Sequence, residues 1–187
     1  FILAAASGLR IGELLGLDIE QHISDGCTTL RIDRQVACRK LVPYTKTAAS
    51  YREVDLHSDV AAVLKRFIGD RVGFLFGTAN GTPMQVAKIW LHLRSALHDL
   101  CYVNPITGTD MAGLHAFRRF RNTHLGKCPN LPPLLHKYWM GHSAGSMSDL
   151  YDKSTEDRGF RTMWAQRCGI GFELPLDLDL TRRDILK

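Results

Sequence analysis

Apolar residues recur along most of this chain every three or four positions, the spacing that places them on one face of a helix. The opening run, residues 1–6, indicates the end of a helix that starts before residue 1 and breaks at Ser7-Gly8. Later helices are expected to begin at Ser58, which has an N-cap side chain, and at Pro83. The same periodicity predicts further helices over residues 9–17, 112–125, 131–140, 146–152 and 155–167.

Short runs of β-branched and apolar residues predict strands over residues 28–37, 40–45 and 51–56. Together they favour a small antiparallel three-stranded sheet near the N-terminal third of a mainly α-helical, α+β protein. No internal repeat and no linker divides the sequence. Residues 1–168 are therefore expected to form one domain, and residues 169–187 a C-terminal tail without clear periodicity.

Composition narrows the class of protein only slightly. Lys and Arg outnumber Asp and Glu by 24 to 19, a mild excess that permits a polyanionic partner without requiring one. The five cysteines are odd in number and lack the short spacings of zinc sites, which favours reduced thiols in the cytoplasm. No apolar run approaches the ~18 residues of a membrane span.

Two segments carry residues whose chemistry fits an anion site. Arg10 opens an otherwise apolar helix, and Glu13, three positions later, can hold its side chain. His115 and Arg118 are also three positions apart and share a helix face, with Phe117 and Phe120 expected to point to the core. Taken alone, the first pair is better explained as a surface ion pair of little energy, and the second fits a basic helix face without a ligand equally well.

Three more segments each contribute one polar residue. Lys46 lies in a polar hairpin between predicted strands, and His142 follows a helix that is expected to end at Gly141. Tyr151 follows in a separate segment. Individually they suit a solvated lysine, a structural histidine and a core tyrosine.

In this order, the five segments resemble the tyrosine recombinase, or phage integrase, family. The family carries a Gly-Leu-Arg-x-x-Glu-Leu box, a hairpin Lys, a His-x-x-Arg box, a Gly-His pair, and a Tyr nine residues after that His. No single box is specific, but the ordered set is, and it covers residues 1 to about 167. The matching residues are Arg10, Lys46, His115, Arg118, His142 and Tyr151.

The sequence departs from the family pattern at a few positions. Arg119 stands where many members have a second His, and Met140 replaces the usual Leu before Gly-His. Lys40 competes with Lys46 for the hairpin position, although Lys46 is better placed relative to the strand at residues 54–56.

The resemblance implies transesterification at a DNA phosphodiester, without a metal or other cofactor. The Tyr151 hydroxyl, whose ordinary pKa is about 10, would attack phosphorus, expel the 5′ oxygen and leave a 3′-phosphotyrosine. His115 would serve as general base or proton relay, His142 as a hydrogen-bond donor to the phosphate, and Lys46 as the acid for the leaving oxygen. Arg10 and Arg118 would stabilise the charge on the non-bridging oxygens, the role of Mg²⁺ in other phosphoryl-transfer enzymes.

This assignment constrains the chain between the last two residues. Nine positions on an unbroken helix make ~2.5 turns, which would put His142 and Tyr151 on opposite faces. The helix must therefore break between them, and Ser143-Ala144-Gly145-Ser146 supplies residues suited to that break.

The implied partner is double-stranded DNA, bound by a protein that is monomeric alone and a homotetramer on its sites. Further basic residues are expected to contact the DNA backbone: Arg39, Lys40, Arg52, Lys88, Arg119 and Arg121. Two alternatives stay open, a type IB topoisomerase-like enzyme that religates the same strand, and a non-catalytic DNA-binding remnant of a mobile element.

Overall fold

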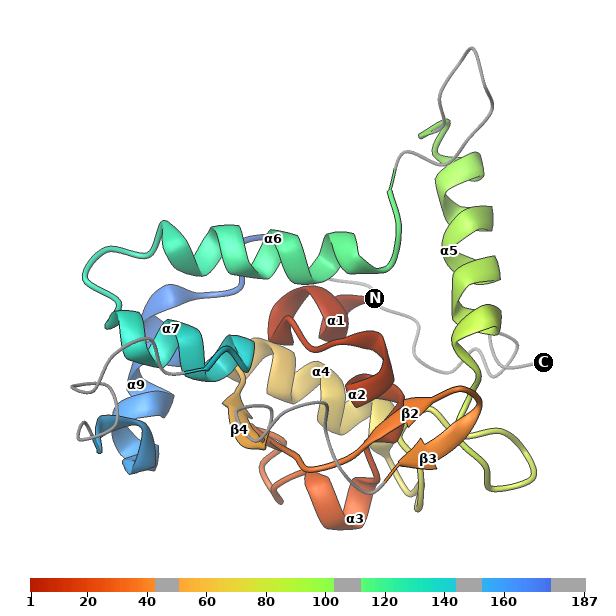
Figure 1. The fold of residues 1–187 in the computed structure, drawn as a ribbon, viewed down its shortest axis with the longest axis horizontal. Helices are drawn as coiled ribbons and strands as arrows, with labels where there is room; N and C mark the ends of the chain where they lie inside the picture. The colour runs from red at the N-terminus through yellow and green to blue at the C-terminus, as the bar shows by residue number, and fades with distance from the viewer. Residues whose placement is uncertain (43–50, 103–111, 144–152, 176–187) are drawn as a thin grey trace.

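The computed structural model describes residues 1–42, 51–102, 112–143 and 153–175, and shows a mainly helical protein (Figure 1). The described helices are α1 (Ile2–Ser7), α2 (Ile11–Gly16), α3 (Ile19–His22), α4 (Ser58–Ile68), α5 (Val86–Asp99), α6 (His115–Gly126), α7 (Pro133–Met140), the 3₁₀ turn η2 (Ser154–Glu156) and α9 (Arg158–Cys168). The mainly α-helical class with a small antiparallel sheet component is confirmed. The predicted helix at 146–152 lies outside the described residues. Each of the other predicted helices corresponds to a helix of the structure.

The helix ends differ from prediction in small ways that have local causes. The break after Ser7 is confirmed, because Gly8 takes the left-handed conformation (φ 67°) that ends a helix. Helix α4 begins at Ser58 as predicted, but the cap is the ring of His57, which accepts the amide of Asp59 at 3.3 Å. Helix α5 begins at Val86 rather than Pro83, since the intervening Met84 amide bonds to Phe76 in an extended segment.

Four short strands form two antiparallel pairs. Strand β1 (Thr29–Ile32) pairs with β4 (Arg52–Asp55), and β2 (Gln35–Ala37) pairs with β3 (Lys40–Val42). Antiparallel pairing is thus confirmed, but within the described ranges the strands make two two-stranded sheets instead of one three-stranded sheet. The run predicted at 28–37 is interrupted after Ile32 and supplies both β1 and β2.

The main core lies where α1 packs between α6 and α4 (Figure 1). Helix α7 runs beside β4 and contributes Leu135, Trp139 and Met140, all 2% exposed or less. Helix α9 closes the same core with Trp164 and Ala165. This arrangement brings the C-terminal end of α7 against the start of α2 and the first turn of α6.

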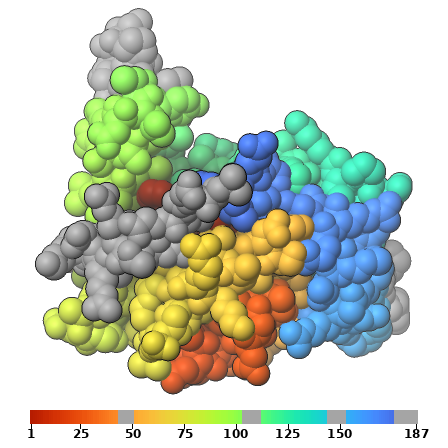
Figure 2. Space-filling view, turned by 180° about the vertical axis from the view of Figure 1, so that it is seen from behind, coloured from red at the N-terminus to blue at the C-terminus, as the bar shows by residue number. Residues whose placement is uncertain are grey.

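Helix α5 stands away from this core at one end of the molecule, as both ribbon and space-filling views show (Figures 1 and 2). Its buried residues are Leu93 and Leu97, whereas Leu91 is 63% exposed. No helix in the described part of the chain is long and apolar enough to cross a membrane.

Candidate functional site

The site begins with the pair predicted at the start of α2. Arg10 is the N-cap of this helix, and its amide donates to Glu13 Oε2 at 2.9 Å while its Nη1 donates to Glu13 Oε1 at 2.7 Å. Glu13 is 2% exposed, whereas a third of the Arg10 side chain reaches solvent. The prediction that Glu13 holds Arg10 is confirmed, and the burial of Glu13 rules out an ordinary surface ion pair.

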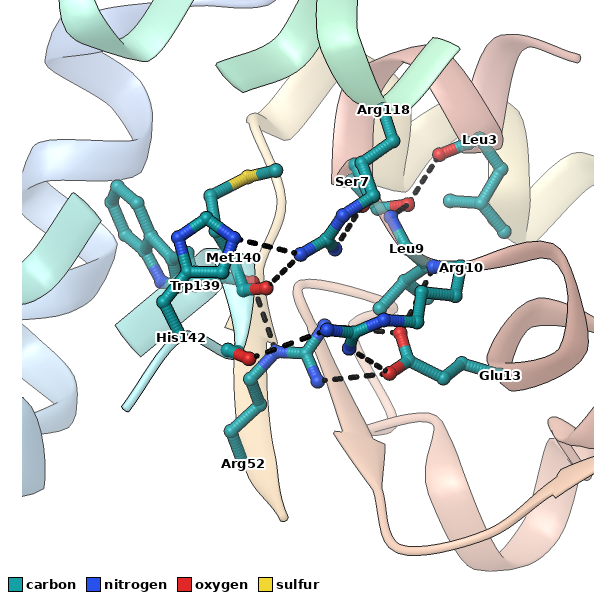
Figure 3. Close-up of polar contacts among 12 residues, drawn as sticks. Leu3, Ser7, Leu9, Arg10, Glu13, Arg52, Arg118, Trp139, Met140 and His142 are labelled. Atoms are coloured by element: carbon teal, nitrogen blue, oxygen red, sulfur yellow. Dashed lines mark hydrogen bonds and ion pairs between the residues drawn. The ribbon is translucent and has the colours of Figure 1, made fainter. Parts of the chain in front are cut away.

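Arginine side chains from three other elements contact the end of α7 (Figure 3). The carbonyl of Trp139 accepts from Arg52 Nε at 2.9 Å, the carbonyl of Met140 accepts from Arg118 Nη2, and that of Gly141 accepts from Arg10 Nη2 at 3.5 Å. Three consecutive carbonyls therefore each receive a different guanidinium. The last carbonyls of a helix lack intrahelical partners and carry partial negative charge, so they suit cations.

Arg118 connects this helix end to the rest of the site. Its Nη1 donates to the carbonyl of Gly8 at 2.8 Å, and its Nη2 lies 3.3 Å from His142 Nε2. Since a guanidinium only donates, Nε2 of His142 must accept, and Nδ1 is then the nitrogen that carries the proton. The donor of the neutral ring is then on the side of the imidazole that faces away from Arg118 (Figure 3).

The charges of this cluster shift one another's pKa values. Burial would raise the pKa of Glu13, but Arg52 and then Arg10 outweigh it, so the pKa lies below its ordinary value. Burial, with the charges of Arg10 and Arg52 against that of Glu13, lowers the pKa of Arg118 to about 10. Desolvation and then the three arginines lower the pKa of His142. At neutral pH the cluster therefore holds three cations, one carboxylate and a neutral imidazole.

The structure brings together three of the six residues predicted to act on the phosphate: Arg10, Arg118 and His142. His115 is exposed at the start of α6, one turn before Arg118. Lys46 and Tyr151 lie outside the described residues, so their placement stays a prediction.

The chain leaves helix α7 immediately before His142. Gly141 ends the helix in the left-handed conformation (φ 60°), as its position in the sequence predicted. The helix therefore does not continue through His142, and the further break expected over residues 143–146 falls largely in the part that is not described.

Two of the predicted DNA-backbone contacts must be corrected. Arg52 is 2% exposed and its Nη2 is paired with Glu13 Oε2 at 3.1 Å, while Arg121 is 3% exposed and donates to the carbonyl of Gly169 at 2.7 Å. Neither guanidinium lies on the surface, so both have structural roles in this fold. Of the remaining four, Lys88 is partly buried and three are exposed: Arg39, Lys40 and Arg119.

The sequence did contain signals for these two interior arginines. Arg52 lies two positions before Val54, so the two share a face of β4, and that face is buried. Arg121 lies four positions after Phe117 and four before Leu125, on the helix face that packs into the core. In contrast, Phe120, expected to face the core, is 39% exposed and contacts Phe172 at its edge.

The cluster has the kinds of side chain that an anion site uses. Among the residues that the structure describes, no three His, Cys, Asp or Glu side chains group as metal ligands would. The guanidiniums carry an excess of positive charge over the one carboxylate, beside a neutral imidazole donor. Such a site suits a phosphate group, because planar paired donors match its oxygens.

Comparison with known proteins finds similar sequences over most of this chain. A family model described as the phage integrase family matches residues 1–158. The integrase of Staphylococcus phage L54a is 30% identical over 129 residues, which are 59% of this chain and 36% of that protein.

Solved structures share the fold at lower identity. The Tn1549 transposon integrase, in complex with transposon right end DNA, has a TM-score of 0.62 at 20% identity and covers 88% of this chain. The integrase from mycobacterium phage Brujita has a TM-score of 0.61 at 16% identity and covers all of it. This chain spans 56% and 55% of those two chains, just over half of each.

Proposed function

The chain belongs to the phage integrase family, and on that premise we propose that it cuts and rejoins DNA through a covalent bond between Tyr151 and a DNA phosphate. The observation that carries the proposal is the meeting of Arg10, Arg118 and His142 at the end of α7 (Figure 3). These residues come from three separate parts of the chain, and a third of the Arg10 side chain stays exposed to solvent beside them.

In the proposed reaction the phosphate lies against the exposed side of this cluster. Arg10 and Arg118 donate to its non-bridging oxygens, where negative charge grows in the transition state. His142 donates a further hydrogen bond to the phosphate. The cations are fixed before the substrate arrives, so no rearrangement is needed at the moment of reaction.

Three proposed groups complete the reaction. Tyr151 is the nucleophile, His115 at the exposed start of α6 is the general base or relay, and Lys46 protonates the 5′ oxygen that leaves. The phosphotyrosine keeps the energy of the phosphodiester, and a second 5′ hydroxyl can attack it to complete strand exchange. The arginines take the charge-stabilising role of a metal, so we propose that neither a metal nor a nucleotide cofactor takes part.

The partners follow from the same premise. We expect double-stranded DNA to bind across the exposed residues Arg39, Lys40 and Arg119, with Lys88 contributing from α5, and exchange to require a homotetramer assembled on DNA from monomers. The structures of the Tn1549 transposon integrase were solved in complexes with transposon right end DNA and with circular intermediate DNA. The free thiols of all five cysteines suit the reducing cytoplasm.

A nicked suicide substrate tests the proposal. Cleavage lets the short 5′ fragment diffuse away, so a protein–DNA adduct that resists denaturation should accumulate. Tyr151→Phe should abolish this adduct and leave the DNA Kd nearly unchanged, while Tyr102→Phe, a change at a phenol that is half exposed beyond α5, should form it normally. Adduct formation by the Tyr151→Phe protein would refute the assignment.

The same adduct separates the open alternatives. A DNA-binding remnant would bind the substrate and give no adduct with either protein. A topoisomerase-like enzyme would give the adduct and relax supercoiled DNA without joining strands from two sites, whereas the proposed recombinase should join strands from two sites.

A further inference from the structure

Arg52 connects three parts of the chain from within the protein. Its side chain is fully enclosed, and its Nε donates to the carbonyl of Trp139 at 2.9 Å. Its Nη1 and Nη2 point to Glu13 Oε1 and Oε2 at 3.4 and 3.1 Å. Strand β4, helix α2 and the end of α7 thus meet on one guanidinium (Figure 3).

We propose that Arg52 is a positioning residue of the phosphate site, acting on Arg10 and His142 through Glu13 and the end of α7 without touching DNA. The inference rests on the proposed function for the identity of the anion. The buried position of Arg52 permits this role and excludes a direct surface contact with DNA.

The first route runs through Glu13. This carboxylate is shared between Arg52, which is enclosed, and Arg10, which reaches solvent. With two cations on it, the carboxylate holds the Arg10 guanidinium through Oε1, while Arg10 Nη2 donates to the carbonyl of Gly141. Without Arg52, the enclosed charge would draw Arg10 inward or take up a proton, and either response moves Arg10 from its place.

The second route runs through α7. The carbonyl of Trp139 lies three residues before His142, and its bond to Arg52 fixes the last peptide planes of the helix. Two other bonds attach the same turn to β4: Tyr138 accepts the amide of Glu53 at 3.0 Å, and Trp139 Nε1 donates to Asp55 at 3.0 Å. Arg52 is the member of this set that also reaches Glu13, so it sets the distance between α2 and the turn that carries His142.

The space around Arg52 fits a planar guanidinium group. A Cβ at Gly141 would lie 2.7 Å from its Nη1 and 2.9 Å from its Cζ, so the guanidinium packs directly on the backbone of that turn. A lysine keeps the charge but cannot direct donors at three acceptors in a plane. Arg52→Lys therefore removes the geometry and retains the charge.

The matched control is Arg121→Lys. Arg121 is equally enclosed and donates to a backbone carbonyl, that of Gly169, outside the site. Both variants lose a buried guanidinium and its hydrogen bonds, so both are expected to be less stable than the parent protein. Each rate is therefore measured at a temperature where all proteins are folded and is corrected for the folded fraction.

Two readouts are compared. The first is the single-turnover rate of adduct formation on the suicide substrate, set against the DNA Kd. The second is hydrogen exchange, without DNA, of the amides of Gly141 and His142, which bond to Tyr138 and Lys137. The buried interior of α4 supplies the reference amides.

For Arg52→Lys we expect adduct formation to slow by roughly tenfold to a hundredfold, since a displacement of about 1 Å has that effect. The Kd should change less than about threefold, and the amides of Gly141 and His142 should exchange faster relative to α4. A rate loss no larger than that of Arg121→Lys would overturn the inference, and so would slowed cleavage with unchanged exchange at those two amides. If the parent protein forms no adduct, the proposed function fails, and the exchange comparison still decides whether Arg52 positions the end of α7.

Discussion

Gly141→Ala is the substitution that most directly tests how the end of α7 is built. Two costs are expected. Gly141 has φ of 60°, a left-handed conformation that costs an alanine about 1 to 2 kcal/mol. The new Cβ would also lie 2.7 Å from Arg52 Nη1, well inside the 3.4 Å at which ordinary contact begins.

The second cost can be estimated from what Arg52 must give up. The guanidinium has to move by about 0.7 Å to restore contact distance, and it is held by Glu13 and the carbonyl of Trp139. Weakening one buried hydrogen bond to a charged group costs about 1.5 to 3 kcal/mol. The total for Gly141→Ala should therefore be about 2.5 to 5 kcal/mol.

Gly81→Ala isolates the backbone part of this cost. Gly81 has φ of 71° and nothing within 4 Å of its added Cβ. It should lose only about 1 to 2 kcal/mol. Urea unfolding followed by circular dichroism gives both free energies, and the Tm of Gly141→Ala should fall at least ~3 °C further than that of Gly81→Ala. Equal losses in the two variants would refute the packing of Arg52 against this turn.

Other consequences of the site can be measured separately. Because the pKa of Glu13 is lowered in the fold, its stabilisation is complete above the unfolded value of 4.5 and is lost as pH falls through the folded pKa. Glu13→Gln should therefore cost roughly 3 to 5 kcal/mol in urea unfolding at pH 7, and much less in acid. Arg118→Gln should raise the pKa of His142 in an NMR titration, and an unchanged curve would contradict their contact. Arg119→Gln should reduce the salt dependence of DNA binding by about one ion, whereas Arg121→Gln should lower stability and leave that slope unchanged. Adduct formation should proceed at the same rate in EDTA, and loss of activity restored by Mg²⁺ would contradict the metal-free reaction.

Local patterns in the sequence were enough for the helices and for the pair at the start of α2. Gly8 and Gly141 marked helix ends because glycine adopts the left-handed conformation without strain, and both take it. The three-residue spacing of Arg10 and Glu13 predicted a contact that depends on helix geometry alone, and the contact is present.

Contacts between distant parts of the chain were not accessible in the same way. Arg52 and Glu13 are far apart in sequence, and nothing local indicates that β4 would direct a guanidinium at α2. The positive charge of Arg52 predicted a surface position, whereas its alternation with Val54 predicted a buried one. The residue is buried, as the strand pattern predicts, because the Glu13 carboxylate and the Trp139 carbonyl accept its donors there. Helix α3 was missed because its four residues are too few for periodicity, although the Asp18 side chain that caps it was visible.

The arginines at the end of α7 bind main-chain oxygens, and this determines which substitutions the sequence tolerates there. A carbonyl is present whatever side chain a position carries, so replacing Met140 by another apolar residue of similar size would leave the acceptor for Arg118 in place. Substitutions at 140 are then limited by core volume and not by the chemistry of the reaction, whereas a substitution of Trp139 would also remove the bond from its Nε1 to Asp55. Gly141 cannot be replaced as freely, because the site requires its left-handed conformation and because a side chain there would clash with Arg52.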